Sequence, residues 1–198
     1  MFKVTYTNRK LGATIASINL PAITTCRADA PCKHDCYASH GTFKYKNVAN
    51  CYNENLRMIK EDIKQAEKDI LSQLPLMGFC RIHASGDFVN KEYFEMLIRI
   101  AKTAKHVKFM AFTKKYELVN EWIAEHGNLP KNFKIIFSAW YTDWTFENPY
   151  NLPIAYIYDK KTDNKIPKNA IPCGGSCQQC MACWMLKKRQ CVVFNKHH

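Results

Sequence analysis

Apolar segments of strand length alternate with amphipathic helix patterns through the middle of the chain, and this alternation constrains the fold more than any other feature. The strand patterns cover residues 78–85, 107–113, 134–140 and 154–159. The helix patterns, with apolar residues three or four positions apart, cover residues 52–74, 91–105 and 116–126. Strands joined through helices form crossovers that pair them in parallel. We therefore expect an α/β fold, with parallel βα repeats forming a partial (TIM-like) barrel or an open sheet.

The chain of 198 residues is predicted to be a single α/β domain, because its length suits one core and no internal boundary is visible. We expect an N-terminal cysteine segment over 1–51, the βα repeats over 52–159 and a cysteine-rich segment over 160–198, with the cysteines in loops. The tail over 187–196 is expected to add a strand or to pack across the domain. His197 and His198 resemble the remnant of a purification tag, so they carry no inference.

The composition predicts a cytoplasmic protein with no membrane association. No run approaches the ~20 apolar residues of a membrane helix, and the N-terminal residues lack the features of a signal peptide. In the cytoplasm thiols stay reduced, so clustered cysteines bind metal more often than they form disulfides. The net charge of +12 favours anionic partners, which include nucleic acid, nucleotides and other small molecules, although the lysines are spread along the whole chain.

Seven of the ten cysteines lie in two short groups. The C-terminal quartet consists of Cys173, Cys177, Cys180 and Cys183. Its spacers of three, two and two residues are those of a ferredoxin cluster motif read in reverse. Thiols this close in sequence rarely reach disulfide geometry with one another. We expect the quartet to hold a [4Fe–4S] cluster. Zinc is the alternative, although zinc sites usually separate their two cysteine pairs by about a dozen residues or more.

The N-terminal trio consists of Cys26, Cys32 and Cys36. Three thiols leave one position of a metal centre open for an outside ligand. The fourth ligand could instead come from the protein, with His34, His40, Cys51 or a cysteine of the quartet as candidates. The last option would join the two groups into one centre, so one cluster or two are both expected outcomes. The remaining cysteines, Cys51, Cys80 and Cys191, are interpreted as structural.

Polar residues follow three successive strand patterns and are candidates for a catalytic pocket. His83, Ser85 and Asp87 end the first, Lys114 follows the second, and Ser138 lies near the end of the third. Parallel α/β sheets and barrels place ligand sites at the carboxyl ends of their strands. We therefore expect these five side chains to line one pocket. The alternative is that polar residues simply begin loops there.

Several motifs resemble the phage "gene product eighty-eight" family. They are NRKLG near the start, CYA after the trio, RIHASGDF over 81–88, AFTK over 111–114 and the C-terminal cysteine run. The resemblance spans nearly the whole chain and implies a phage or prophage origin, hence the cytoplasm of a host cell.

A cysteine trio followed by βα repeats is also similar to the partial barrel of radical S-adenosylmethionine enzymes. That resemblance implies that the trio holds a [4Fe–4S] cluster whose open iron binds S-adenosylmethionine. Gly86 and Asp87 would then bind the cofactor's amino group, and the quartet would hold an auxiliary cluster. The trio is spaced five and three residues apart, where those enzymes typically have three and two, and fewer strand patterns are visible than their six.

Three functions follow as hypotheses. The first is a phage iron–sulfur protein acting as a small radical-SAM-like enzyme. The second is a zinc-stapled module that binds single-stranded nucleic acid through its charge and by stacking on Trp140, Tyr141 and Trp144. The third is a non-catalytic phage accessory protein with a structural cluster.

Overall fold

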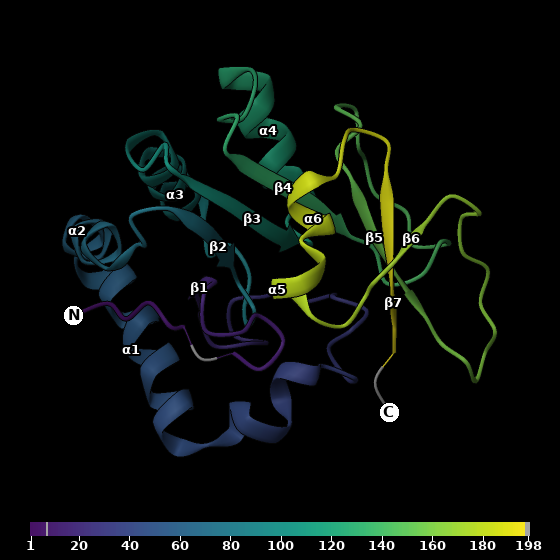
Figure 1. Ribbon diagram of the computed structural model, residues 1–198, viewed down its shortest axis with the longest axis horizontal. Helices are drawn as coiled ribbons and strands as arrows, with labels where there is room; N and C mark the ends of the chain where they lie inside the picture. The colour runs from purple at the N-terminus through teal and green to yellow at the C-terminus, as the bar shows by residue number, and fades with distance from the viewer. Residues whose placement is uncertain (7, 197–198) are drawn as a thin grey trace.

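An all-parallel sheet of seven strands forms the centre of this computed structural model, which describes residues 1–6 and 8–196 (Figure 1). The strand order is β1-β2-β3-β4-β5-β7-β6. The strands are β1 (Ala16–Ile18), β2 (Gly78–Ile82), β3 (Val107–Thr113), β4 (Phe133–Ser138), β5 (Ile154–Tyr158), β6 (Ile171–Pro172) and β7 (Cys191–Asn195). The first five lie side by side in chain order, so every crossover between them moves in one direction. This order occurs in partial barrels and in singly wound open sheets, and it confirms the parallel α/β fold.

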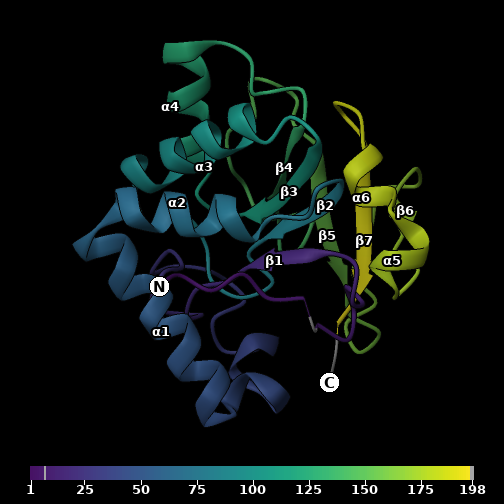
Figure 2. The same cartoon turned by 60° about the vertical axis from the view of Figure 1, so that its left-hand side comes forward.

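Four helices cover one face of the sheet, as two views show (Figures 1 and 2). They are α1 (Lys46–Glu61), α2 (Ile63–Gln73), α3 (Lys91–Thr103) and α4 (Tyr116–His126). The single helix expected over 52–74 is wrong, because the chain breaks at Asp62. The Asp62 carboxylate accepts a 2.9 Å hydrogen bond from the backbone N–H of Gln65 and so caps α2. The apolar spacing continues across this break, which hid it in the sequence.

The other face of the sheet is covered by the C-terminal segment with its two short helices, α5 (Cys177–Cys180) and α6 (Ala182–Met185) (Figure 2). Trp184 of α6 fixes this segment to the sheet, since its indole N–H donates to the carbonyl of Lys108 at 3.2 Å and its ring meets Phe79 edge-on. Each face therefore has its own apolar core. Burial on both faces explains why the strands are almost continuously apolar.

One expectation about the cysteines needs correction, and two strands were missed. Only Cys173 of the quartet lies in a loop, after β6, because Cys177 and Cys180 belong to α5 and Cys183 belongs to α6. The strands β1 and β6 were not expected, because three and two residues are too few to show an alternating pattern. The tail does add a strand, β7. In the part of the chain that the structure describes, no helix has both the length and the apolar character needed to span a membrane.

Candidate metal and ligand sites

The trio lies in irregular chain that follows β1, beside the carboxyl end of β2. The Cys26 thiol is partly buried, and its pKa is raised to about 11, first by burial and then by the negative charges of Asp87, Cys32 and Cys36. These groups are therefore within electrostatic reach of one another. All ten cysteines of the chain are free thiols. The fold thus brings the trio to Asp87, the acid that the sequence analysis assigned to the same pocket.

Asn19 holds the trio loop to the end of β2, and the sequence analysis missed it. Its side chain is buried, and its Oδ1 accepts hydrogen bonds from the backbone N–H groups of Ala84 (2.8 Å) and Ser85 (3.3 Å). Its Nδ2 donates to the Thr5 hydroxyl at 3.0 Å. The available signal was a lone amide after the apolar run that became β1. Asn19 fixes where the trio loop begins.

Gly86 allows the trio loop to approach the end of β2 closely. Its φ of +85° lies in the left-handed region, and a Cβ there would stand 2.7 Å from Thr25 Oγ1 and 2.9 Å from the carbonyl oxygen of Leu20. The backbone N–H of Asp87 donates to the same Thr25 hydroxyl at 3.0 Å. Since Thr25 directly precedes Cys26, the glycine has a structural role that is separate from the cofactor binding expected of it.

The Asp87 carboxylate is buried among hydrogen-bond donors. Its Oδ1 accepts from the Thr113 hydroxyl (2.6 Å) and from the backbone N–H of Phe88 (2.8 Å), and its Oδ2 accepts from the backbone N–H of Lys114 (2.9 Å). Burial raises the pKa of Asp87, while these three bonds oppose that rise. A carboxylate has about four acceptor positions. Donors of the protein itself therefore fill three of these positions.

Lys114 and Ser138 meet next to Asp87. The Lys114 ammonium donates to the Ser138 hydroxyl at 2.8 Å and lies 6.0 Å from the centre of the Trp140 ring. It also favours ionisation of Asp87 through its charge. The carboxyl ends of β2, β3 and β4 thus contribute an acid, an ammonium and a hydroxyl to one region.

Lys196, just after β7, closes this region from the other side. Its ammonium lies 2.9 Å from Asp35 and 3.1 Å from Asp159, and 5.9 Å from the centre of the Trp140 ring. Asp35 directly precedes Cys36. The ion pair therefore fixes the trio loop to the last strand.

His83 and Ser85 are placed differently from the other three candidates. The buried His83 ring faces α3, where its Nε2 lies 3.0 Å from the Tyr93 hydroxyl and the ring stacks on Tyr93 and meets Phe88. Ser85 is buried and held by Asn19. The structure therefore gathers Asp87, Lys114 and Ser138 beside the trio and places His83 in the helix-side core. The catalytic roles of all five residues remain predictions.

Burial of neutral His83 should make the protein less stable in acid. Burial lowers the pKa of His83 from 6.5 to about 3, so the native state binds fewer protons than the unfolded chain. The stability is present above pH 6.5 and is lost as the pH falls toward 3. Between pH 7 and 5 the loss from this one residue is about 2 kcal/mol. Urea unfolding should show a His83→Gln variant losing about 2 kcal/mol less than wild type over this range. Equal losses in His83→Gln and wild type would contradict the assignment.

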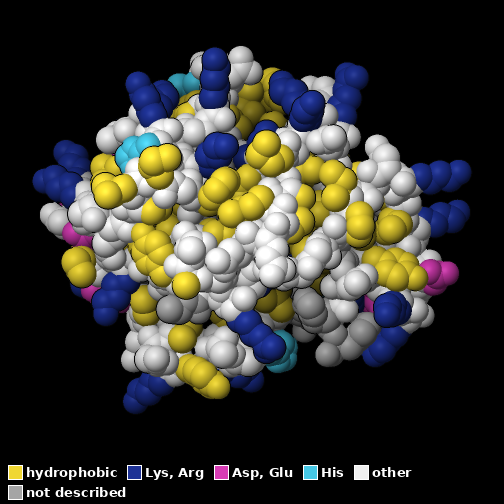
Figure 3. Space-filling view, in the orientation of Figure 1, with side chains coloured by type: hydrophobic (Ala, Val, Ile, Leu, Met, Phe, Trp, Pro, Cys, Tyr) yellow, Lys and Arg dark blue, Asp and Glu magenta, His cyan; other side chains and the backbone are white. Residues whose placement is uncertain are grey.

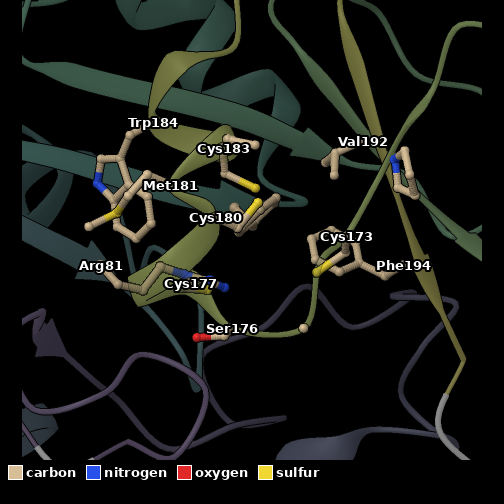
Figure 4. A pocket seen from close by; sticks show the side chains of 14 residues that line it. Arg81, Cys173, Ser176, Cys177, Cys180, Met181, Cys183, Trp184, Val192 and Phe194 are labelled. Atoms are coloured by element: carbon tan, nitrogen blue, oxygen red, sulfur yellow. The ribbon is translucent and has the colours of Figure 1, made fainter.

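The quartet lines a small cavity on the opposite face of the sheet (Figure 4). Its enclosed space is about 20 Å³, and Cys180 at its edge is exposed. Burial raises the pKa of Cys183 to about 12; the charge of Arg81 opposes this rise, and the other three thiols add to it. The four thiols thus share one site with an arginine. By donor chemistry such a site fits a soft metal or an iron–sulfur cluster.

Across residues 1–6 and 8–196, no three His, Cys, Asp or Glu side chains are arranged to hold a metal ion. The metal-ligand roles of the trio and quartet therefore remain predictions. Of the candidates for a fourth ligand to the trio, His34 and His40 are exposed and Cys51 is partly buried in α1. Cys80 and Cys191 are buried in strands, as expected for structural thiols.

A hollow of about 540 Å³ lies against the chain that follows the trio. Two short 3-10 helices form much of its wall, η1 (Tyr37–Ser39) and η2 (Gly41–Lys44). Arg9, His40 and the edge-to-face pair Tyr37 and Phe43 also line it. Its volume is within the usual range for small-molecule sites.

The comparisons with known proteins agree with the motifs. The family model described as Gene product 88 matches residues 2–186, which include both cysteine groups and every strand except β7. No curated protein and no solved structure matches the chain. Because the family model covers nearly the whole chain, the protein belongs to the Gene product 88 family.

Proposed function

We propose that the protein is an iron–sulfur enzyme in which Cys26, Cys32 and Cys36 hold a reactive [4Fe–4S] cluster next to a pocket for a small zwitterionic ligand such as S-adenosylmethionine. The observation that carries the proposal is the position of the trio loop beside Asp87, whose backbone N–H donates at 3.0 Å to the hydroxyl of Thr25, the residue before Cys26, at the carboxyl ends of parallel strands. When bound, a cluster with an open iron supplies one electron and a ligand-binding position.

The side chains of the pocket suit such a ligand. Asp87 would accept one further hydrogen bond, from an ammonium group, beyond those from its three protein donors. Lys114 and Ser138 together offer a cation and a hydroxyl, which suit a carboxylate. The hollow beside η1 and η2 is lined by Asp35 of the trio loop but by none of Asp87, Lys114 and Ser138, and it has the volume of a small-molecule site. These residues would bind and orient the ligand.

The quartet would hold a second, auxiliary cluster. Its short spacers and shared cavity support this assignment. The quartet lies on the sheet face opposite the four large helices.

The arrangement of basic and aromatic side chains does not favour the nucleic-acid hypothesis. On the face shown in Figure 3, Lys and Arg side chains project around the rim and do not form a single stripe. Trp144 packs against the helix-side core, and Trp140 already contacts two lysine ammonium groups. Single-strand binding uses aromatic rings that are free for bases to stack on.

Iron and sulfide analysis after anaerobic reconstitution tests the proposal. Wild type should be brown, with about four irons and four sulfides per cluster. Replacing the trio with serine (Cys26, Cys32 and Cys36) should remove one cluster and leave that of the quartet; replacing the quartet should do the reverse. If the two groups form one centre, either set of substitutions removes all the iron. The double variant Cys51→Ser, Cys191→Ser is the matched control and should keep wild-type iron. Colourless protein that retains only zinc would contradict the proposal.

The ligand pocket is tested separately by equilibrium dialysis with S-adenosylmethionine. Asp87→Ala removes a charge-assisted hydrogen bond, so it should weaken binding by about tenfold or more. The affinity is measured per cluster, because the substitution also leaves the Thr113 hydroxyl and two backbone N–H groups without an acceptor. Ser138→Ala should have a smaller effect in the same direction. Wild-type protein that carries the cluster but does not bind the ligand, or variants that bind as wild type does, would favour the accessory-protein hypothesis.

A further inference from the structure

The N-terminal turn over residues 8–12, the NRKLG motif, packs directly against the quartet helix α5. The backbone N–H of Gly12 donates to the carbonyl of Asn8 at 2.8 Å and closes the turn. Gly12 has a φ of +75°, and a Cβ there would overlap Gln178 Oε1. The backbone N–H of Cys177 donates to the carbonyl of Lys10 at 2.9 Å. Residues 8–12 thus pack against the cysteine quartet, which lies more than 160 residues later in the chain.

Arg81 reaches the same site from β2. Its neighbours Cys80 and Ile82 face the helix-side core, so the alternation along the strand directs Arg81 to the quartet. Its guanidinium carbon lies 4.4 Å from the centre of the Phe112 ring, and its Nε donates to the carbonyl of His83 at 3.3 Å. Figure 4 shows the side chain extending alongside Cys177. Within the described residues, Arg81 forms no salt bridge, so no carboxylate neutralises it.

Lys10 adds a second positive charge. Its ammonium lies 4.7 Å from the centre of the ring of Phe194, which lines the cavity. Four thiolates around a [4Fe–4S] core of charge +2 carry a net charge of −2. The two cations therefore match the charge that a cluster would bring to this site.

We propose that Arg81, assisted by Lys10, supplies the countercharge of the quartet and raises the reduction potential of the cluster held there. A nearby positive charge stabilises the more negative, reduced form, and net charge is one of the factors that set cluster potentials. The inference rests on the proposed function only in that the quartet holds a cluster; it is independent of the trio and its ligand.

The test uses the full chain with Cys26, Cys32 and Cys36 replaced by serine, so that only the quartet can be reconstituted with iron and sulfide. A redox titration followed by electron paramagnetic resonance measures the midpoint potential. Arg81→Met keeps the apolar stem and removes the charge, so it should shift the one-electron equilibrium about tenfold toward the oxidised form, a fall of about 59 mV. Arg81→Lys keeps the charge and should retain most of the potential.

Lys108→Met is the matched control. Lys108 also covers an aromatic ring on this sheet, Phe79, with its ammonium 5.6 Å from the ring centre, but it does not line the quartet cavity. It should leave the potential unchanged. A cluster that assembles with Arg81→Lys but not with Arg81→Met would support the countercharge role. An unchanged potential in Arg81→Met, or an equal fall in Lys108→Met, would overturn the inference. If the quartet alone binds no iron, the inference also fails. Iron bound by the trio in a variant in which only the four quartet cysteines are replaced would then show that the proposed function survives.

Discussion

A Gly86→Ala variant should have a free energy of unfolding about 3 kcal/mol lower than that of wild type, and it should lose the trio's iron. At a φ of +85° an alanine costs about 1–2 kcal/mol. Its Cβ would also stand 2.9 Å from the carbonyl oxygen of Leu20, and this backbone atom can move only if the trio loop moves with it. Overpacking of this kind adds about 1–3 kcal/mol. The trio loop would shift away from Asp87, so iron binding by the trio should fall together with the free energy of unfolding.

Gly127→Ala tests a positive φ without the close approach. Gly127 has a φ of +80° and a ψ of −142°, a conformation that also favours glycine, and a Cβ there would meet nothing within 4 Å. The free energy of unfolding of Gly127→Ala should therefore fall only by the cost of the backbone conformation, and the protein should keep all of its iron. Chemical denaturation and iron analysis of both variants provide the comparison. If Gly86→Ala cost no more than Gly127→Ala and kept the trio's iron, the close approach of the loop would not matter.

An Asn19→Ala variant should have a free energy of unfolding roughly 2–5 kcal/mol lower than that of wild type, because it leaves two buried backbone N–H groups without an acceptor. Those groups, on Ala84 and Ser85, lie where the chain turns from β2 toward Asp87. The Thr5 hydroxyl also loses its donor from Asn19 Nδ2. The trio loop would be released at its start, so the iron bound by the trio should fall while that of the quartet stays.

Asn90→Ala is the comparison for this loss. The Asn90 side chain caps α3 by accepting one hydrogen bond, at 2.9 Å from the backbone N–H of Tyr93. Its removal should cost about 1 kcal/mol and leave both iron sites intact. Urea unfolding and iron content measured on the same samples decide the result. An Asn19→Ala variant as stable as Asn90→Ala would show that the amide is not needed to hold the loop.

The helices and central strands could be predicted from the sequence because their signals are local. The residues of β3 and α4 were predicted to the residue, since apolar periodicity and flanking turn residues define both. The break between α1 and α2 was missed, because one capping aspartate does not interrupt the apolar spacing. The strand β1 was missed because three residues carry no period, and its identity depends on pairing with β2.

The candidate site could be predicted only in part, because contacts between distant segments leave no local signal in the sequence. The cysteine groups stood out through their spacing, and polar residues at strand ends pointed to Asp87, Lys114 and Ser138. The sequence could not show that His83, the first residue after its strand and with a φ of +61°, faces the helix-side core. Nor could it show that Asn19 and Thr25 hold the trio loop, since both act through contacts with residues far along the chain.

By itself, the sequence determined the parallel α/β class, the two groups of thiols and the family, because each is carried by local pattern or by motif. Only the tertiary structure decided which groups share a site. It brought the trio to Asp87 at the carboxyl ends of the strands, and it brought the quartet to Arg81 and the N-terminal turn on the other face of the sheet. The physical reason is that strand register and strand order, which depend on pairing between distant segments, decide which side chains become neighbours.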